Sequence, residues 1–255
     1  MFRAQRTFMF FSRIFTDTAT ILPKPLSTLF NDAAAHFERF EIKRQLFKEL
    51  QQGLAEGRIT HLDAAQRIAY SVHADMTRRN GKPYISHVKA VVDAPNRYVD
   101  ITYNPIQVML AWVHDVPEDS KGAWTVRDFR KLGFPLEFLQ GLDGITHRKG
   151  EKYFDYIERL SRTPVRPVKV GDNRHNWADN PKPHKEMLYR ISSHYLLAIE
   201  FGKIEAGSDI AQWAANEGMY SEELFGKHSS RALIKNYEPP QNKKHMASIP
   251  VPAAL

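Results

Sequence analysis

The chain has no cysteine among its 255 residues. Disulfide bonds, thiolate zinc sites and a cysteine nucleophile are therefore excluded, and any metal ion would have to be bound by His, Asp or Glu. A chain without cysteine also fits a reducing compartment, so we expect a cytoplasmic protein.

Long apolar runs are missing as well. No stretch approaches the roughly 20 residues that a membrane-spanning helix needs, so we predict no association with a membrane. The 13 glycines follow no triplet repeat, which excludes a collagen-like fibre. A glycine-rich phosphate loop of the Walker or dinucleotide type is also absent, which argues against ATP-driven chemistry and Rossmann binding.

The composition is that of a globular protein, with 42% hydrophobic and 25% charged residues. Lys and Arg number 36 against 29 Asp and Glu, which gives a net charge of +7. Such a charge favours anionic ligands such as nucleotides, phosphates or nucleic acid, and the alternative is a solvated basic surface. No nucleic-acid-reading motif is recognised, so we expect no specific nucleic-acid partner.

Helix signals recur along the chain, and no alternating strand pattern accompanies them, so we predict an all-α fold. Asn31 or Asp32 can cap a helix that stops at Gly57, and Thr60 with Asp63 resembles a capping box opening a helix to about Arg79. Further helices are predicted after Asn104-Pro105, from Thr125, from Pro135, over 151–160, over about 185–201 and, as one or two amphipathic helices, over 208–237.

The same signals predict four regions. An N-terminal leader covers 1–30, where Phe and Arg alternate and no acidic residue precedes Asp17. The main domain covers 31–205 and a C-terminal helical extension covers 206–238. A disordered tail rich in Pro and Lys covers 239–255.

The densest group of titratable residues is the run from His114 to Asp119, whose sequence is HDVPED. Along a helix, His114 and Glu118 would share one face and Asp115 and Asp119 the neighbouring face. Such a group can bind a metal through His114 and Asp115 and keep a carboxylate pair close by. Pro117 cannot donate the next helical hydrogen bond, so we expect the helix to end here, with the carboxylates in a less regular turn.

Two other segments offer further metal ligands. A Gly/Pro turn over 80–83 leads into a short apolar stretch with His87, and an apolar lead-in from Val168 presents Asp172 before a polar run to Asn176. A lone His or Asp is more often structural or exposed. His61, His147, His175 and His184 are read in the same way, as capping, surface or ligand-supporting residues.

Together these segments resemble a known family. The order His87, His114-Asp115, Asp172 is similar to the H…HD…D signature of the HD superfamily of metal-dependent phosphohydrolases, which are helical bundles. The blocks RRNGKPYISH, HDVPED, THRKGEKYFDYIERL and VKVGDNRHNW, spread over roughly 60–200, resemble the hydrolase domain of the RelA/SpoT alarmone enzymes, and especially the small alarmone hydrolases.

The resemblance implies a role for each matching residue. His87, His114, Asp115 and Asp172 correspond to the ligands of one divalent metal ion, typically Mn²⁺. The catalytic carboxylates, which position or deprotonate the attacking water and assist the leaving group, correspond to Glu118 and Asp119. The residues that fall in the family's substrate pocket are Arg78, Arg79, Lys149, Tyr153 and Asn176.

The chain also departs from the family pattern. Pro117 replaces a small apolar residue, Ser120 stands where Thr is usual, and Gly171 replaces Ala. Asn173 and Arg174 alter the usual Asp-Arg-Leu-His-Asn run. None of these changes removes a predicted ligand, so we expect them to affect substrate preference more than hydrolysis.

The resemblance therefore implies an HD-domain bundle that hydrolyses the 3′-pyrophosphate of ppGpp or pppGpp to GDP or GTP and pyrophosphate. About 50 residues follow Gly207, fewer than a usual domain, so we expect no synthetase activity. The implied role is to relieve the stringent response or to counteract a paired alarmone synthetase. Two alternatives stay open: an HD hydrolase for another phosphorylated nucleotide, and a nucleotide-sensing module without turnover.

Overall fold

The computed structural model describes residues 24–231 and 234, and this part of the chain is all-α, as predicted. Its regular elements are helices, apart from one isolated antiparallel bridge. None of these helices is long and apolar enough to cross a membrane. The predicted tail, and the leader as far as residue 23, lie outside the described residues.

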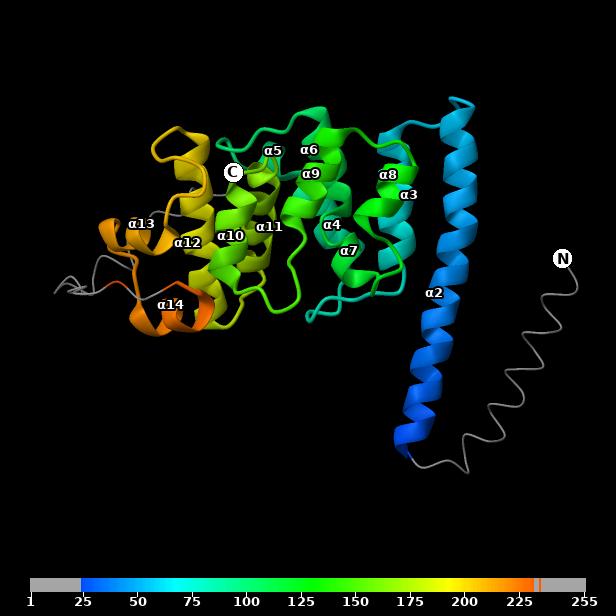
Figure 1. The fold of residues 1–255 in the computed structure, drawn as a ribbon, viewed down its shortest axis with the longest axis horizontal. Helices are drawn as coiled ribbons and strands as arrows, with labels where there is room; N and C mark the ends of the chain where they lie inside the picture. Colours follow the sequence, from blue (N-terminus) through cyan, green and yellow to red (C-terminus); the bar gives the residue numbers. More distant parts are fainter. Residues whose placement is uncertain (1–23, 232–233, 235–255) are drawn as a thin grey trace, which may run out of the picture. The chain divides into compact units, whose positions relative to one another are not determined.

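The helices in Figure 1 are α2 (Lys24–Ala55), α3 (His61–His73), α4 (Ile85–Val92), α5 (Ala94–Arg97), α6 (Pro105–Val113), α7 (Val116–Asp119), α8 (Val126–Lys131), α9 (Leu136–Ile145), α10 (Tyr153–Ser161), α11 (Arg166–Ala178), α12 (Pro183–Glu200), α13 (Ile210–Asn216) and α14 (Glu222–His228).

The chain divides into two compact units within α2, and the second unit begins at Phe47. Helix α2 itself starts at Lys24, so the predicted cap at Asn31 or Asp32 is wrong. Pro25 stands in its first turn. Backbone N–H groups in a first turn have no partner within the helix, so proline, which has no N–H, costs no hydrogen bond there, and its fixed φ suits a helix. The predicted site residues all belong to the second unit.

Several predicted helix ends are confirmed. Gly57 follows α2 with a positive φ of 66°, a backbone conformation that glycine adopts without a steric penalty. Thr60 and Asp63 form the predicted capping box of α3, in which each side chain bonds the other residue's backbone N–H. Asn104 and Gln107 cap α6 in the same reciprocal way, with Pro105 in the first turn.

The chain leaves α3 earlier than predicted. The helix ends at His73 and not near Arg79, because the chain reverses there and Thr77 forms the antiparallel bridge with Pro83. Gly81 lies in this reversal with a φ of 79°. The turn delivers the chain to α4.

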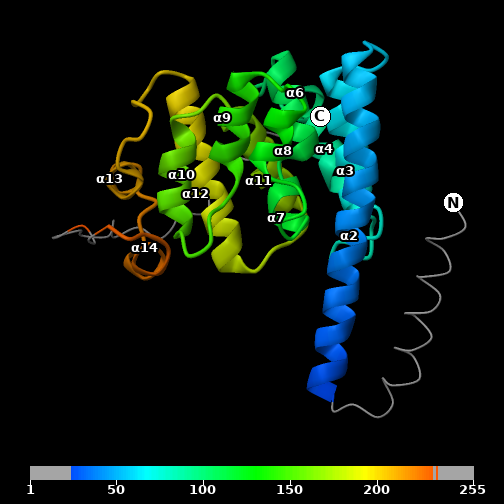
Figure 2. The ribbon, with the colours of Figure 1, turned by 45° about the vertical axis from the view of Figure 1, so that its right-hand side comes forward.

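Two helices that carry predicted site residues were not predicted as helices. Helix α4 has only eight residues, and the polar second half of α11 hides its periodicity. Helix α11 contacts α4, α6 and α12 and lies between them in the second unit (Figures 1 and 2). It therefore brings Asp172 to the segments that carry the predicted histidines.

Helix α6 is buried along most of its length. Its residues from Met109 to Val113 are all buried, which explains why this part of the helix is apolar at every position. The helix ends at Val113, with His114 as its C-cap, and the one-turn helix α7 follows with Pro117 in its first turn. The predicted end is confirmed, although the carboxylates lie in a short helix and not in an irregular turn.

The C-terminal extension packs against α10. The rings of Phe154 and Phe225 stack with centroids 4.1 Å apart, and Lys152 donates a hydrogen bond of 2.8 Å from Nζ to the carbonyl of Ser229. Asp155 accepts a hydrogen bond from the backbone N–H of Ser230. The extension, α13 and α14, lies beside α10 and α12 in Figure 1.

A glycine in α11 allows the close approach to the α4–α5 corner. A Cβ at Gly171 would lie 2.9 Å from the Cβ of Ala94 and 2.7 Å from the hydroxyl of Tyr103. Ala94 is fully buried, and the Tyr103 hydroxyl donates to the carbonyl of Val91, so neither neighbour can move freely. The glycine at this position thus has a packing reason.

We expect Gly171→Ala to lower the free energy of unfolding by about 1–3 kcal/mol, although Ala is intrinsically the better helix former. Urea denaturation measures the change. Adding Ala94→Gly should recover part of the loss, because it removes one of the two close contacts. Equal stability of the wild type and the Gly171→Ala variant would contradict this account.

Candidate metal centre

Three separate segments bring four predicted ligands together. His87 comes from α4, His114 and Asp115 from the junction of α6 and α7, and Asp172 from α11. Both histidines are almost fully buried, at 0% and 1% exposure, and Asp172 is 3% exposed. The cluster lies where α4, α6 and α11 meet.

The facing atoms of these side chains lie close to one another. His114 Nε2 is 3.0 Å from Asp115 Oδ2, and His87 Nε2 is 3.2 Å from Asp172 Oδ1. The two Nε2 atoms are 3.3 Å apart. His87 Nε2 is also 3.6 Å from Asp115 Oδ2, and His114 Nε2 is 3.8 Å from Asp172 Oδ1. All four residues thus direct donor atoms to one small region.

Neighbouring groups form hydrogen bonds with these side chains and fix their orientation. His114 Nδ1 lies 2.9 Å from the carbonyl of Ala111, which can only accept, so this nitrogen carries a proton, and in the neutral ring Nε2 keeps its lone pair. The Tyr84 hydroxyl donates to Asp115 Oδ2 at 2.6 Å.

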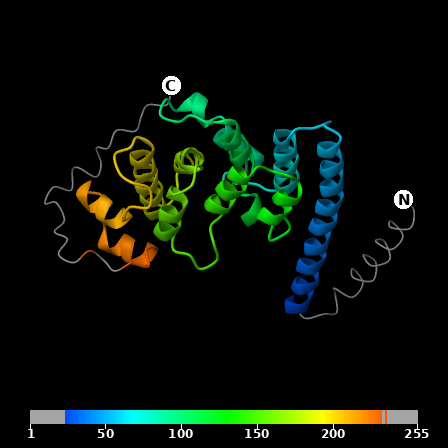
Figure 3. The same ribbon diagram turned by 45° about the horizontal axis from the view of Figure 1, so that its top comes forward.

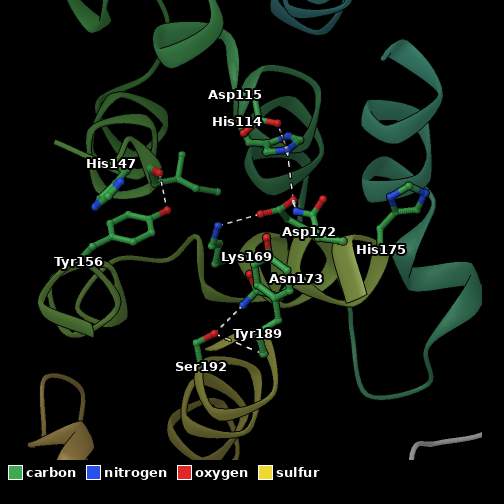
Figure 4. A network of polar contacts seen from close by, with 12 residues as sticks. His114, Asp115, His147, Tyr156, Lys169, Asp172, Asn173, His175, Tyr189 and Ser192 are labelled. Atoms are coloured by element: carbon green, nitrogen blue, oxygen red, sulfur yellow. Dashed lines mark hydrogen bonds and ion pairs between the residues drawn. The ribbon is translucent and has the colours of Figure 1, made fainter. Parts of the chain in front are cut away.

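Asp172 is bonded on both oxygens. Lys169 Nζ donates to Oδ2 at 2.8 Å and Asn176 Nδ2 to Oδ1 at 2.6 Å. Lys169 and Asn176 stand three residues before and four after Asp172, so all three share one face of α11. Figure 4 shows Lys169 and Asp172 joined across this face, with His114 and Asp115 opposite.

The charges in the cluster are strongly coupled. Burial alone would lower the pKa of His114, but the carboxylates of Asp115 and Asp172 outweigh it and raise this pKa to about 9. Burial would raise the pKa of Asp115, and the two histidines hold it well below its usual value. Lys169 together with His87 likewise lowers the pKa of Asp172. Both acids are therefore ionised and require positive charge beside them.

These residues fit a divalent metal ion. Donor atoms of His87, His114 and Asp115 all lie within 4.8 Å of one another, and Asp172 adds a carboxylate oxygen. Two imidazoles and two carboxylates suit a hard to borderline divalent ion. A bound ion would also replace the protons that the histidines otherwise need beside two ionised acids. The possible metal site is thus present, and its preferred metal stays a prediction.

A pocket of about 350 Å³ opens over the cluster. Its wall combines carboxylates, cations and phenol rings, a lining suited to a polar ligand. The lining residues are Tyr84, His114, Asp115, Glu118, Ile145, His147, Tyr153, Tyr156, Lys169, Asp172, Asn176, Lys185, Leu188 and Tyr189.

The two predicted catalytic carboxylates have different surroundings. Glu118 lines the pocket, and its carboxylate accepts a hydrogen bond from the backbone N–H of His147 at 2.8 Å. Burial raises the pKa of Glu118. Asp119 lies 3.2 Å from Nε2 of the buried His73, outside the pocket lining. Glu118 is therefore the one of the two that can face a ligand in this pocket.

The predicted substrate residues are only partly brought together. Arg78 binds Asp179 and donates to Asn176 Oδ1 at 3.0 Å, so Asn176 links Arg78 to Asp172. The Tyr153 hydroxyl lies 3.1 Å from Ser192 Oγ.

Arg79 and Lys149 are exposed and do not line the pocket. Lys149 lies in the loop between α9 and α10, and this loop is visible in Figure 3.

Sequence reasoning assigned no role to three of the residues that touch the predicted site. These are Tyr84, Lys169 and His73. Lys169 stands three residues before Asp172, the acid that it binds, so a helical reading of this segment would have placed the two on one face. Tyr84 could not be found from spacing, because its partner Asp115 is 31 residues away. His73 could not be found in this way, because its partner is 46 residues away. His175, for which a supporting role was one expectation, lies beside His87.

No protein-family model matches the chain.

We expect Mn²⁺ to raise the melting temperature of the protein, because an ion that binds the folded state stabilises it by about 2.7 kcal/mol at a concentration 100 times its Kd. Differential scanning fluorimetry with and without Mn²⁺ measures the shift. Asp115→Asn should abolish the shift, whereas Asp75→Asn, which removes an exposed acid outside the cluster, should leave it unchanged. A shift of equal size in Asp115→Asn would place the ion elsewhere.

Proposed function

We propose that this chain is a metal-dependent phosphohydrolase that removes the 3′-pyrophosphate of ppGpp or pppGpp. The observation that carries the proposal is the group of two histidines and two aspartates, of which only Asp115 is partly exposed, beneath a pocket lined by cations and by a carboxylate outside the ligand set. A metal ion can activate water, a carboxylate can act as general base, and cationic side chains can bind phosphate, so the three together suit phosphate hydrolysis. The guanosine substrate is taken from the resemblance of the four sequence blocks.

The reaction breaks the bond between the ribose 3′ oxygen and the first phosphorus of the pyrophosphate. The oxygen of water forms the new bond to phosphorus, and the departing 3′ oxygen takes a proton. A divalent ion at the cluster would supply Lewis acidity toward the phosphoryl group. Glu118 lies in the pocket and has a raised pKa, so it is suited to take a proton from water and return it to the 3′ oxygen.

Cationic side chains would bind the phosphates. Lys169 and Lys185 line the pocket. Burial alone would lower the pKa of Lys169, but the carboxylate of Asp172 outweighs it and raises this pKa well above the usual value, so Lys169 stays charged. Arg78, held by Asp179 and Asn176, lies next to the pocket wall. Charge-assisted hydrogen bonds from such groups bind phosphate more strongly than neutral donors do.

The test is incubation of the purified protein with ppGpp and Mn²⁺, followed by ion-exchange chromatography of the products. We expect GDP and pyrophosphate from the wild type and neither from Asp115→Ala, which lacks a predicted ligand. Asp75→Asn should match the wild type.

The same assay on a panel of phosphorylated nucleotides defines the substrate. Hydrolysis of another nucleotide with ppGpp left intact would reject the proposed substrate and retain the reaction class. Stoichiometric Mn²⁺ binding without hydrolysis of any nucleotide would reject catalysis and favour a sensing module.

A second variant tests the assigned proton transfer. We expect Glu118→Gln to lower kcat by about 10²- to 10⁴-fold, the usual contribution of a general acid–base, because the amide cannot exchange a proton. The Kd for Mn²⁺, measured by calorimetry, should not change, since Glu118 is not a predicted ligand. A kcat close to that of the wild type would contradict the role given to Glu118.

A further inference from the structure

His175 makes a contact with the predicted metal centre that the proposed function does not use. Its Nδ1 lies 2.8 Å from His87 Nδ1, and the two ring centroids are 4.8 Å apart. The two residues come from α11 and α4 and are 88 positions apart in the sequence. This contact is on the far side of the His87 ring from Nε2, the atom that faces Asp172 and His114.

Two ring nitrogens at this distance share one proton, and the side that carries it decides what His87 can do. If His175 donates, the neutral His87 ring must carry its own proton on Nε2, where a metal ion would bind. If His87 donates from Nδ1, its Nε2 presents a lone pair to the cluster. The second arrangement gives His87 the same protonation pattern as His114, which carries its proton on Nδ1 because this atom faces the carbonyl of Ala111.

We propose that His175 is a positioning residue that accepts the Nδ1 proton of His87 and so fixes His87 with Nε2 free to bind a divalent metal ion. The inference rests on the metal centre of the proposed function but not on its substrate. His175 is not itself a ligand, because its Nδ1 faces the back of the His87 ring. The position is suited to this task, since α11 carries both His175 and Asp172 and sets them three residues apart.

Partners behind a metal-binding histidine commonly change metal affinity by about 10- to 100-fold when they are removed. The side chains of Asn and Leu have the same branching, and Oδ1 of Asn stands near the place of Nδ1 of His. His175→Asn therefore keeps an acceptor for His87, and His175→Leu removes it at nearly constant volume. His184→Leu removes an exposed histidine and serves as the control.

The experiment is a titration of each purified variant with Mn²⁺, with free Mn²⁺ followed by electron paramagnetic resonance. We expect His175→Leu to weaken binding about 10- to 100-fold. His175→Asn should keep most of the wild-type affinity, and His184→Leu all of it. Melting temperatures without metal identify variants that do not fold, and His175→Phe, a ring without an acceptor, then replaces His175→Leu.

Two results from the His175 variants would overturn the inference. One is wild-type affinity in the Leu or Phe variant, and the other is an equal loss in the Asn and Leu variants, which indicates a packing role only. Tight Mn²⁺ binding that depends on His175 in a protein that does not hydrolyse ppGpp would reject the proposed function and support the inference. A wild type without an Asp115-dependent Mn²⁺ site would reject both.

Discussion

The structure depends on keeping two ionised aspartates and two imidazoles together in a buried position. Bringing Asp115 and Asp172 out of water is costly unless positive charge compensates them. The protein supplies part of that charge permanently through Lys169, which binds Asp172. The histidines supply the rest when protonated, and a divalent ion can take their place. The cluster is therefore costly to assemble without a cation, which is an argument for a binding role and against a purely structural one.

Much of the fold could be predicted, because the relevant signals are local. The capping boxes at Thr60 and Asn104 involve residues three positions apart, and each marks its helix start correctly. Pro117 likewise marks the end of the buried helix before it. Helix α11 was not predicted, because its polar residues serve the site and obscure the periodicity of a buried helix. Sequence patterns describe best those helices whose residues serve only folding.

The site itself was partly accessible from sequence. The resemblance to a known family named all four residues that converge. Without it, the sequence would have supported only His114 and Asp115 as metal ligands, because these two are adjacent. The convergence depends on α11 packing against α4, and the missing side chain at Gly171 allows α11 to approach Ala94 and Tyr103 next to that helix. Contacts between residues 88 positions apart, such as His87 with His175, follow from that tertiary contact and have no signature in the chain.

Helix α10 connects the pocket to a part of the chain far from the metal ligands. One side of it carries Tyr153 and Tyr156, which line the pocket, and the other side holds the C-terminal extension through Phe154 and Asp155. The extension is therefore linked to one wall of the pocket through the residues of α10. The pocket wall and the cluster of predicted ligands are thus held in place by different sets of contacts.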